Sequence, residues 1–171
     1  HGCKRADWRL SFARAVPQTG TFEERQKLIM LKIYCDQFDF SALEKAFDGE
    51  TESDCVLAAE IVVTDEEEIR RLNCETRGVD AVTDVLSYPS LDNIRGVTLK
   101  KADFPMDLDE EGNLFLGSIA ICKKRAEEQE VNYLACHGMW HLLGYDHMTD
   151  GDKAIMRERE EKVMSKAGLK R

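Results

Sequence analysis

The chain has 171 residues, of which 43% are hydrophobic, so it can bury one core of ordinary domain size, and we expect a single domain over residues 1–171. Its formal net charge of -9 argues against a non-specific nucleic-acid coat, because neutralising phosphates requires clustered lysine and arginine. No apolar run approaches the roughly 18 residues of a membrane span, and the first residues lack the apolar stretch of a secretory signal, so we expect a soluble, cytoplasmic protein.

The first predicted elements are a strand and the helix that follows it. Residues 1–30 match no pattern that we can assign, and the apolar stretch Leu28–Tyr34 fits either the end of a helix or a short strand. Cys55–Val63 is apolar and ends in β-branched residues, which predicts a strand. Thr64 and Glu67 then form a T-x-x-E capping box, which predicts that a helix begins there.

Two further strands are predicted after this helix. Arg77-Gly78 should end the helix, and Val85–Tyr88 predicts a short strand that stops at Pro89. Residues 90–113 predict a long loop that closes in a turn before the next strand, Leu114–Ile121.

Two helices complete the predicted order. Lys123–Leu143 has helical periodicity, and Gly144 is a suitable helix terminator. Thr149 or Asp150 can cap a final helix that ends near Gly168. Strands interleaved with helices indicate an α+β (mixed α/β) fold, with a small mixed sheet of about four strands packed against helices.

The cysteines and the two acidic runs do not indicate a functional site. The six cysteines contain no C-x-x-C pair, so neither a zinc ribbon nor a disulfide scaffold is indicated, and we expect reduced, mostly buried thiols. The acidic runs Glu127–Glu130 and Glu158–Glu161 are typical of solvated helix faces.

The histidines carry the main functional signal, because three of the four lie within eleven residues, at positions 137, 141 and 147. Residues four apart on a helix project from one face, so His137 and His141 can present ring nitrogens to one point. Gly144 allows a left-handed turn that can return His147 to the same point. The spacing therefore predicts a three-histidine site for one metal ion.

Zinc is the metal that this site indicates first. Three protein ligands with an open fourth position are typical of catalytic zinc, although imidazole sites also take nickel, iron or manganese. The helix that carries two ligands would then be zincin-like. Asp146 either hydrogen-bonds a ligand imidazole or caps the turn.

The same spacing occurs in metzincin peptidases, whose motif is H-E-x-x-H-x-x-G-x-x-H. In those enzymes the glutamate beside the first histidine is the general base. Here Gly138 occupies that position, so peptide hydrolysis is the less favoured alternative.

Three segments of the chain resemble the YbeY family of metal-dependent endoribonucleases. His137–His147 resembles the family's histidine signature, and Leu72–Pro89 resembles its L-N-x-x-x-R-G-x-x-x-x-T-D-V-L-S-F-P stretch. Leu116–Ile121 resembles its L-G-D-I strand. The three segments follow in the right order, and the match extends over residues 55–165.

The resemblance implies that His137, His141 and His147 bind one zinc ion and that Arg77 is the catalytic residue outside the ligand set. It further implies a single-strand-specific endoribonuclease, over residues 31–171, that acts in ribosomal RNA maturation, including 3′ end processing of small-subunit RNA, and in ribosome quality control. Its partners would be single-stranded RNA and ribosomal particles or proteins, without DNA or membrane. A guanidinium suits this chemistry because it donates planar, bidentate hydrogen bonds to phosphate.

One more functional alternative remains, and the chain differs from the family pattern at two places. A non-catalytic ribosome assembly factor with a structural metal is a further alternative. The family's aspartate in the L-G-D-I strand is Ser118 here, and the interval from Cys122 to His137 is shorter than in the family. Arg70 and Arg71, on the same segment as Arg77, are candidates for a positive cleft on an acidic body.

Overall fold

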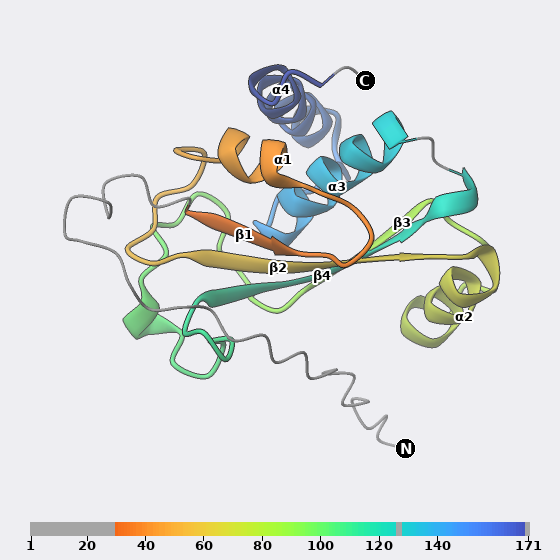
Figure 1. The fold of residues 1–171 in the computed structure, drawn as a ribbon, viewed down its shortest axis with the longest axis horizontal. Helices are drawn as coiled ribbons and strands as arrows, with labels where there is room; N and C mark the ends of the chain where they lie inside the picture. The colour runs from red at the N-terminus through yellow and green to blue at the C-terminus, as the bar shows by residue number, and fades with distance from the viewer. Residues whose placement is uncertain (1–29, 126–127, 170–171) are drawn as a thin grey trace.

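The computed structural model describes residues 30–125 and 128–169, which form a four-stranded sheet with helices on both faces (Figure 1). The strands in sheet order are β1 (Leu31–Tyr34), β2 (Leu57–Thr64), β4 (Leu114–Cys122) and β3 (Val85–Pro89). The first three run parallel, and β3 pairs antiparallel with β4 at the edge. The predicted α+β class with a small mixed sheet is therefore confirmed.

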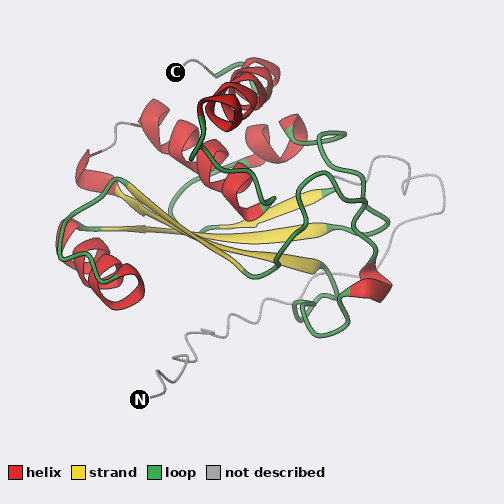
Figure 2. Ribbon diagram, turned by 180° about the vertical axis from the view of Figure 1, so that it is seen from behind, coloured by secondary structure: helices red, strands yellow, loops and turns green. Residues whose placement is uncertain are grey.

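The helices are divided unequally between the two faces of the sheet. They are α1 (Ser41–Ala46), α2 (Glu66–Arg77), α3 (Glu128–Leu142) and α4 (Asp150–Lys166). Helix α2 covers one face, and the other three lie on the opposite face (Figures 1 and 2). There α3 packs against β3 and β4, and α4 packs against α3 and α1. Within the two described ranges, every helix is too short or too polar to cross a membrane.

Strand β4 separates two apolar clusters. Ile119 and Ile121 belong to the large core cluster beneath α3, whereas Ala120 and Cys122 pack with Ile69 of α2. This division follows from the pleat of a strand, which directs successive side chains to opposite faces. At this end of β4, odd-numbered residues therefore face α3 and even-numbered residues face α2.

The first half of the chain differs from the predicted elements in detail. Of the stretch that fitted a helix end or a strand, Leu31–Tyr34 forms strand β1, and residues 28–29 lie outside the described residues. Helix α2 is capped by Asp65, whose carboxylate accepts from the backbone N–H of Glu68, so the predicted cap at Thr64 is wrong by one residue. Gly78 ends α2 as expected, and the short helix α1 was not predicted.

The second half of the chain needs one correction. A 3-10 turn, Lys123–Arg125, follows β4, and the described part of α3 is Glu128–Leu142, so the α-helix predicted from Lys123 does not include the first three of these residues. The cap of α4 is Thr149, which accepts from the backbone N–H of Asp152. The five described cysteines are free, and two of them are buried.

Helix α4 is fixed to the rest of the molecule by a buried acidic side chain. Glu50, with 2% of its side chain exposed, accepts hydrogen bonds from Lys162 and Lys166 at 2.9 and 2.6 Å. Burial opposes ionisation of this carboxyl, but the two lysines outweigh burial and hold the pKa of Glu50 below its ordinary value. These ion pairs attach α4 to the segment that precedes β2.

Candidate metal centre

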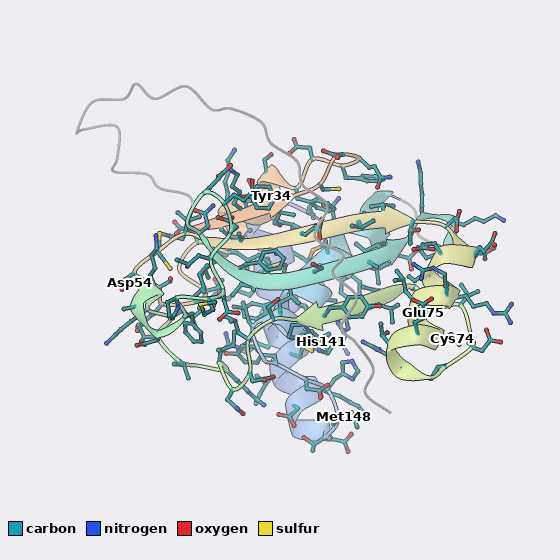
Figure 3. The ribbon with its side chains drawn as sticks, turned by 90° about the horizontal axis from the view of Figure 1, so that it is seen from below. Tyr34, Asp54, Cys74, Glu75, His141 and Met148 are labelled. Carbon is teal, nitrogen blue, oxygen red and sulfur yellow. The ribbon has the colours of Figure 1, made fainter. Side chains whose placement is uncertain are left out.

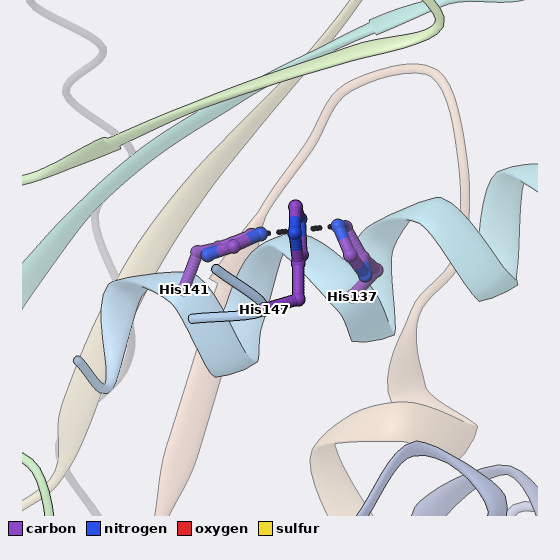
Figure 4. Close-up of side chains that lie close together, drawn as sticks. All are labelled: His137, His141 and His147. Atoms are coloured by element: carbon purple, nitrogen blue, oxygen red, sulfur yellow. Dashed lines mark hydrogen bonds between the residues drawn. The ribbon is translucent and has the colours of Figure 1, made fainter. Parts of the chain in front are cut away.

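The structure brings the three predicted histidines together at one point. His137 and His141 project from the same face of α3, one turn apart, and His147 approaches them from the loop after the helix (Figure 4). One ring nitrogen from each lies within 4.8 Å of the others. His137 and His141 are partly buried and His147 is exposed, so the cluster opens toward solvent.

The turn at Gly144 returns His147 to the helix. Gly144 has a φ of +82°, in the left-handed region that favours glycine. Its N–H donates to the carbonyl of His141, and the N–H of Tyr145 donates to the carbonyl of Trp140. This hydrogen-bond pattern closes a helix and reverses the chain, as the sequence predicted.

Both helical histidines have their second ring nitrogen engaged. Nδ1 of His137 lies 2.7 Å from Oε1 of Glu160, and Nδ1 of His141 lies 2.9 Å from the carbonyl oxygen of Tyr145. A carboxylate and a carbonyl only accept, so Nδ1 of each ring carries a proton, and in the neutral form of each ring Nε2 keeps a lone pair. The two Nε2 atoms face one another at 3.1 Å, as the dashed line in Figure 4 shows.

When both rings are neutral, two lone pairs at this distance repel unless a cation lies near both, so the arrangement fits a metal site. Zinc–nitrogen bonds in a tetrahedral site place two ligand nitrogens about 3.4 Å apart. Burial, followed by the neighbouring His137 and His147, holds the pKa of His141 below its ordinary value, which favours the neutral form that a metal requires. The three side chains could therefore hold one ion of zinc's size.

The position of a metzincin's general base is closed in this structure. A Cβ atom built on Gly138 would lie 2.8–3.0 Å from the side chain of Ile119 on β4. Gly138 therefore faces the sheet and lets α3 approach it closely. A glutamate there would meet the core instead of the histidine cluster.

Replacing Gly138 by alanine should lower the free energy of unfolding by about 1–3 kcal/mol, because the added methyl overpacks a filled interface. Gly151→Ala is the matched control, since Gly151 is also helical and a Cβ there meets only Thr149 Oγ1, at 3.9 Å. That control should be neutral or slightly stabilising. Denaturant unfolding measures both variants, and equal stabilities would contradict the close contact.

Arg77 does not contact the histidines. It lies in the last turn of α2, and its Nη2 donates to the carbonyl oxygen of Ser87 in β3 at 3.5 Å. Helix α3 reaches β3 from the other face, and Figure 3, viewed from below, shows His141 beside this edge strand. Arg77 and the histidines thus approach the same edge of the sheet from two sides.

The other arginines of α2 are already engaged. Arg70 pairs with Asp80, and Arg71 pairs with two glutamates of its own helix. Their charges are therefore compensated, so the expected positive cleft does not form from them. In the part of the chain that the structure describes, Arg77 shows no carboxylate partner.

Two polar residues near the motifs have structural contacts. Ser118 faces the α2 side of the sheet, where its Oγ donates to Oε2 of Glu60 at 3.2 Å, so it points away from the histidines. Asp146 accepts from the backbone N–H of His147 at 2.7 Å. Of the two roles left open for Asp146, the structure shows the one in the turn.

Glu160 is the site residue that the sequence prediction missed. The run Glu158–Glu161 was interpreted as a solvated face, and this is wrong for Glu160, which is 5% exposed. A usable signal was present, because Met156, Glu160, Val163 and Met164 follow the i, i+4, i+7, i+8 spacing of a buried helix face.

Comparison with known proteins identifies the family. The family model described as Endoribonuclease YbeY matches residues 38–168. Endoribonuclease YbeY of Clostridium acetobutylicum is 44% identical over 125 residues, covering 65% of this chain and 75% of that protein. The protein of the same name from Clostridium kluyveri is 42% identical over 123 residues, covering 64% and 75%.

Among solved structures, the solution structure of TM1509 from Thermotoga maritima aligns over 80% of this chain and 88% of that chain, with 21% identity and a TM-score of 0.45. The family match contains Arg77 and all three histidines of the candidate centre. Because the match spans most of the sequence, the chain belongs to the YbeY endoribonuclease family.

Proposed function

We propose that this protein is a zinc-dependent, single-strand-specific endoribonuclease of the cytoplasm, with residues 31–171 as its catalytic domain. Its substrate is ribosomal RNA, including the 3′ end of small-subunit RNA, and it works in rRNA maturation and ribosome quality control with ribosomal particles or proteins as partners. His137, His141 and His147 are the zinc ligands, and Arg77 is the catalytic residue.

The observation that carries this proposal is the close approach of the Nε2 atoms of His137 and His141, which lie 3.1 Å apart. Hydrogen bonds at both Nδ1 atoms fix that orientation, so the two rings are set for a cation before one binds. The exposed ring of His147 leaves one side of the cluster accessible to a large substrate such as RNA.

The metal held by the histidines and the side chain of Arg77 have different roles in cleaving a phosphodiester. When bound, zinc supplies Lewis-acid polarisation and a nucleophile at neutral pH. Arg77 offers guanidinium donors to the charge that develops on the phosphate oxygens, and the structure shows no carboxylate in the described residues that would compete for them.

The peptidase alternative is disfavoured by packing as well as by composition. Gly138 faces Ile119, so the general base of a metzincin has neither a carboxylate nor space at that position. Phosphate chemistry suits the remaining groups, three imidazoles and a guanidinium with no carboxylate partner among the described residues, better than peptide hydrolysis does.

The test is cleavage of one RNA in two forms, single-stranded and annealed to its complement, by the protein before and after removal of metal by a chelator. We expect cleavage of the single strand alone, its loss after chelation, and its return when zinc is added back. Metal analysis of the untreated protein identifies the resident ion.

Three outcomes would overturn the proposal. Undiminished cleavage by the chelated protein would remove the metal from the chemistry. Digestion of casein would restore the peptidase alternative. Bound metal without cleavage of any RNA, together with co-sedimentation with ribosomal particles, would favour an assembly factor with a structural metal.

A further inference from the structure

Glu160 is a buried carboxylate that lies beside the candidate metal centre but comes from a different helix. Of the three polar residues of the described part that are buried as whole residues, Asn73, Ser118 and Glu160, only Glu160 is acidic. Burying a carboxylate costs several kcal/mol unless partners compensate it. Its place against α3 therefore calls for an explanation beyond packing.

Both carboxylate oxygens of Glu160 are bonded to α3. Oε1 lies 2.7 Å from Nδ1 of His137, and Oε2 accepts from the hydroxyl of Tyr133 at 2.9 Å. Tyr133 and His137 are one helical turn apart, so a single carboxylate bridges two successive turns of α3. This bridge fixes the carboxylate plane and, through it, the orientation of the His137 ring.

The helix that carries Glu160 is itself held firmly. Met156, Val163 and Met164 bury the same face of α4 in the main core. On another side of α4, Lys162 and Lys166 form ion pairs with the buried Glu50. The carboxylate of Glu160 is consequently positioned by the body of the molecule and not by a mobile side chain on the surface.

The acceptors of the two helical histidines differ in charge. His141 donates from Nδ1 to a neutral backbone carbonyl, whereas His137 donates to an anion. An anionic acceptor draws the Nδ1 proton toward itself and so increases electron density at Nε2, the atom that faces the metal position. His137 should therefore be the stronger electron donor of the two.

We propose that Glu160 is a positioning residue for the metal centre: it fixes the Nδ1–H tautomer and ring orientation of His137 and strengthens Nε2 as a ligand, with Tyr133 holding its second oxygen. This inference rests on the metal site of the proposed function. Glu160 acts through His137 and needs no contact with RNA.

The main test compares zinc affinity, measured by competition with a chelating dye, for the wild type, Glu160→Gln and Glu158→Gln. Glu158→Gln makes the same change in charge on the exposed face of the same helix. We expect Glu160→Gln to bind zinc roughly 10- to 100-fold more weakly, the usual effect of losing such a partner, and Glu158→Gln to match the wild type. Equal affinities for the two variants would overturn the proposal.

A second readout needs no metal. In chelated, ¹⁵N-labelled protein, at a pH well above the ordinary pKa of histidine, NMR of the imidazoles should show His137 with its proton on Nδ1, and Glu160→Gln should shift this tautomer toward Nε2–H. An unchanged tautomer would contradict the role of Glu160. If the wild type binds no zinc, the metal site of the proposed function fails, while the tautomer still decides whether Glu160 positions His137.

Tyr133→Phe provides a milder variant should Glu160→Gln fold poorly, because it leaves the carboxylate in place and removes only one hydrogen bond to it. We expect a smaller, several-fold loss of zinc affinity, since one hydrogen bond is worth about 1 kcal/mol. Affinity equal to that of the wild type would show that the second oxygen needs no support from Tyr133.

Discussion

Replacing His147 by alanine is expected to abolish RNA cleavage while leaving the fold intact. His147 is the exposed member of the histidine cluster, whereas His137 and His141 are partly buried, so its removal should not disturb the core. If the cluster holds zinc as proposed, loss of one of its three ligands should remove the metal from the site. Because a catalytic metal contributes several kcal/mol to the transition state, the cleavage rate should fall by at least about 10³-fold.

Two measurements separate this effect from unfolding. Thermal unfolding of metal-free His147→Ala should match that of the metal-free wild type, and zinc should stabilise only the wild type. Met148→Ala changes the neighbouring residue, which is 79% exposed, and should still bind one equivalent of zinc. Cleavage at the wild-type rate by His147→Ala would rule this residue out as a ligand.

Replacing Arg77 by alanine is expected to lower kcat by about 10²- to 10³-fold without loss of metal, because a positioned donor to developing charge is typically worth that much. The side chain is exposed and shows only the weak contact with Ser87, so the cost to stability should be small. Single-turnover cleavage measures the loss of rate, and zinc affinity shows whether the metal is retained.

Two further variants test whether the effect is specific to the guanidinium of Arg77. Arg77→Lys keeps the charge but loses the planar pair of donors, so we expect partial activity between the wild type and Arg77→Ala. Arg71→Ala removes the same charge from the same helix, but Arg71 is already paired with two glutamates, so its rate should stay near that of the wild type. Equal rates for Arg71→Ala and Arg77→Ala would show that Arg77 has no particular place in the chemistry.

The predictable parts of the fold are those that local patterns determine. The β-branched end of β2, the glycine after α2 and the threonine before α4 each specify a boundary through backbone sterics or capping. Helix α1 has only six residues and no side-chain cap, so its stability comes from contacts with β1 and α4 that no local pattern reveals. The 3-10 turn Lys123–Arg125, which lies where the sequence predicted the start of a helix, likewise depends on the direction in which the chain leaves β4.

The candidate site likewise has one part that local sequence patterns predict and another part that depends on packing. Its three histidines lie on one helix and the turn after it, so their spacing alone predicts that they meet. The bond from Glu160 to His137 crosses between helices, 23 residues apart in sequence, and depends on how α4 packs. The surroundings of Ser118 could not be predicted either, because the face toward which a strand residue points follows from the sheet and not from the motif.

The position of Glu160 on α4 has a consequence for the order in which the protein is made. A ribosome synthesises the three histidines before Glu160, and α4 must also dock on α3 before the carboxylate reaches His137. A nascent chain that ends short of α4 therefore has all three proposed ligands but lacks the acceptor that orients the first. The complete centre therefore forms only after α4 has been synthesised and has docked on α3, so an enzyme proposed to cut ribosomal RNA would reach full activity later than the point at which its three proposed ligands are made.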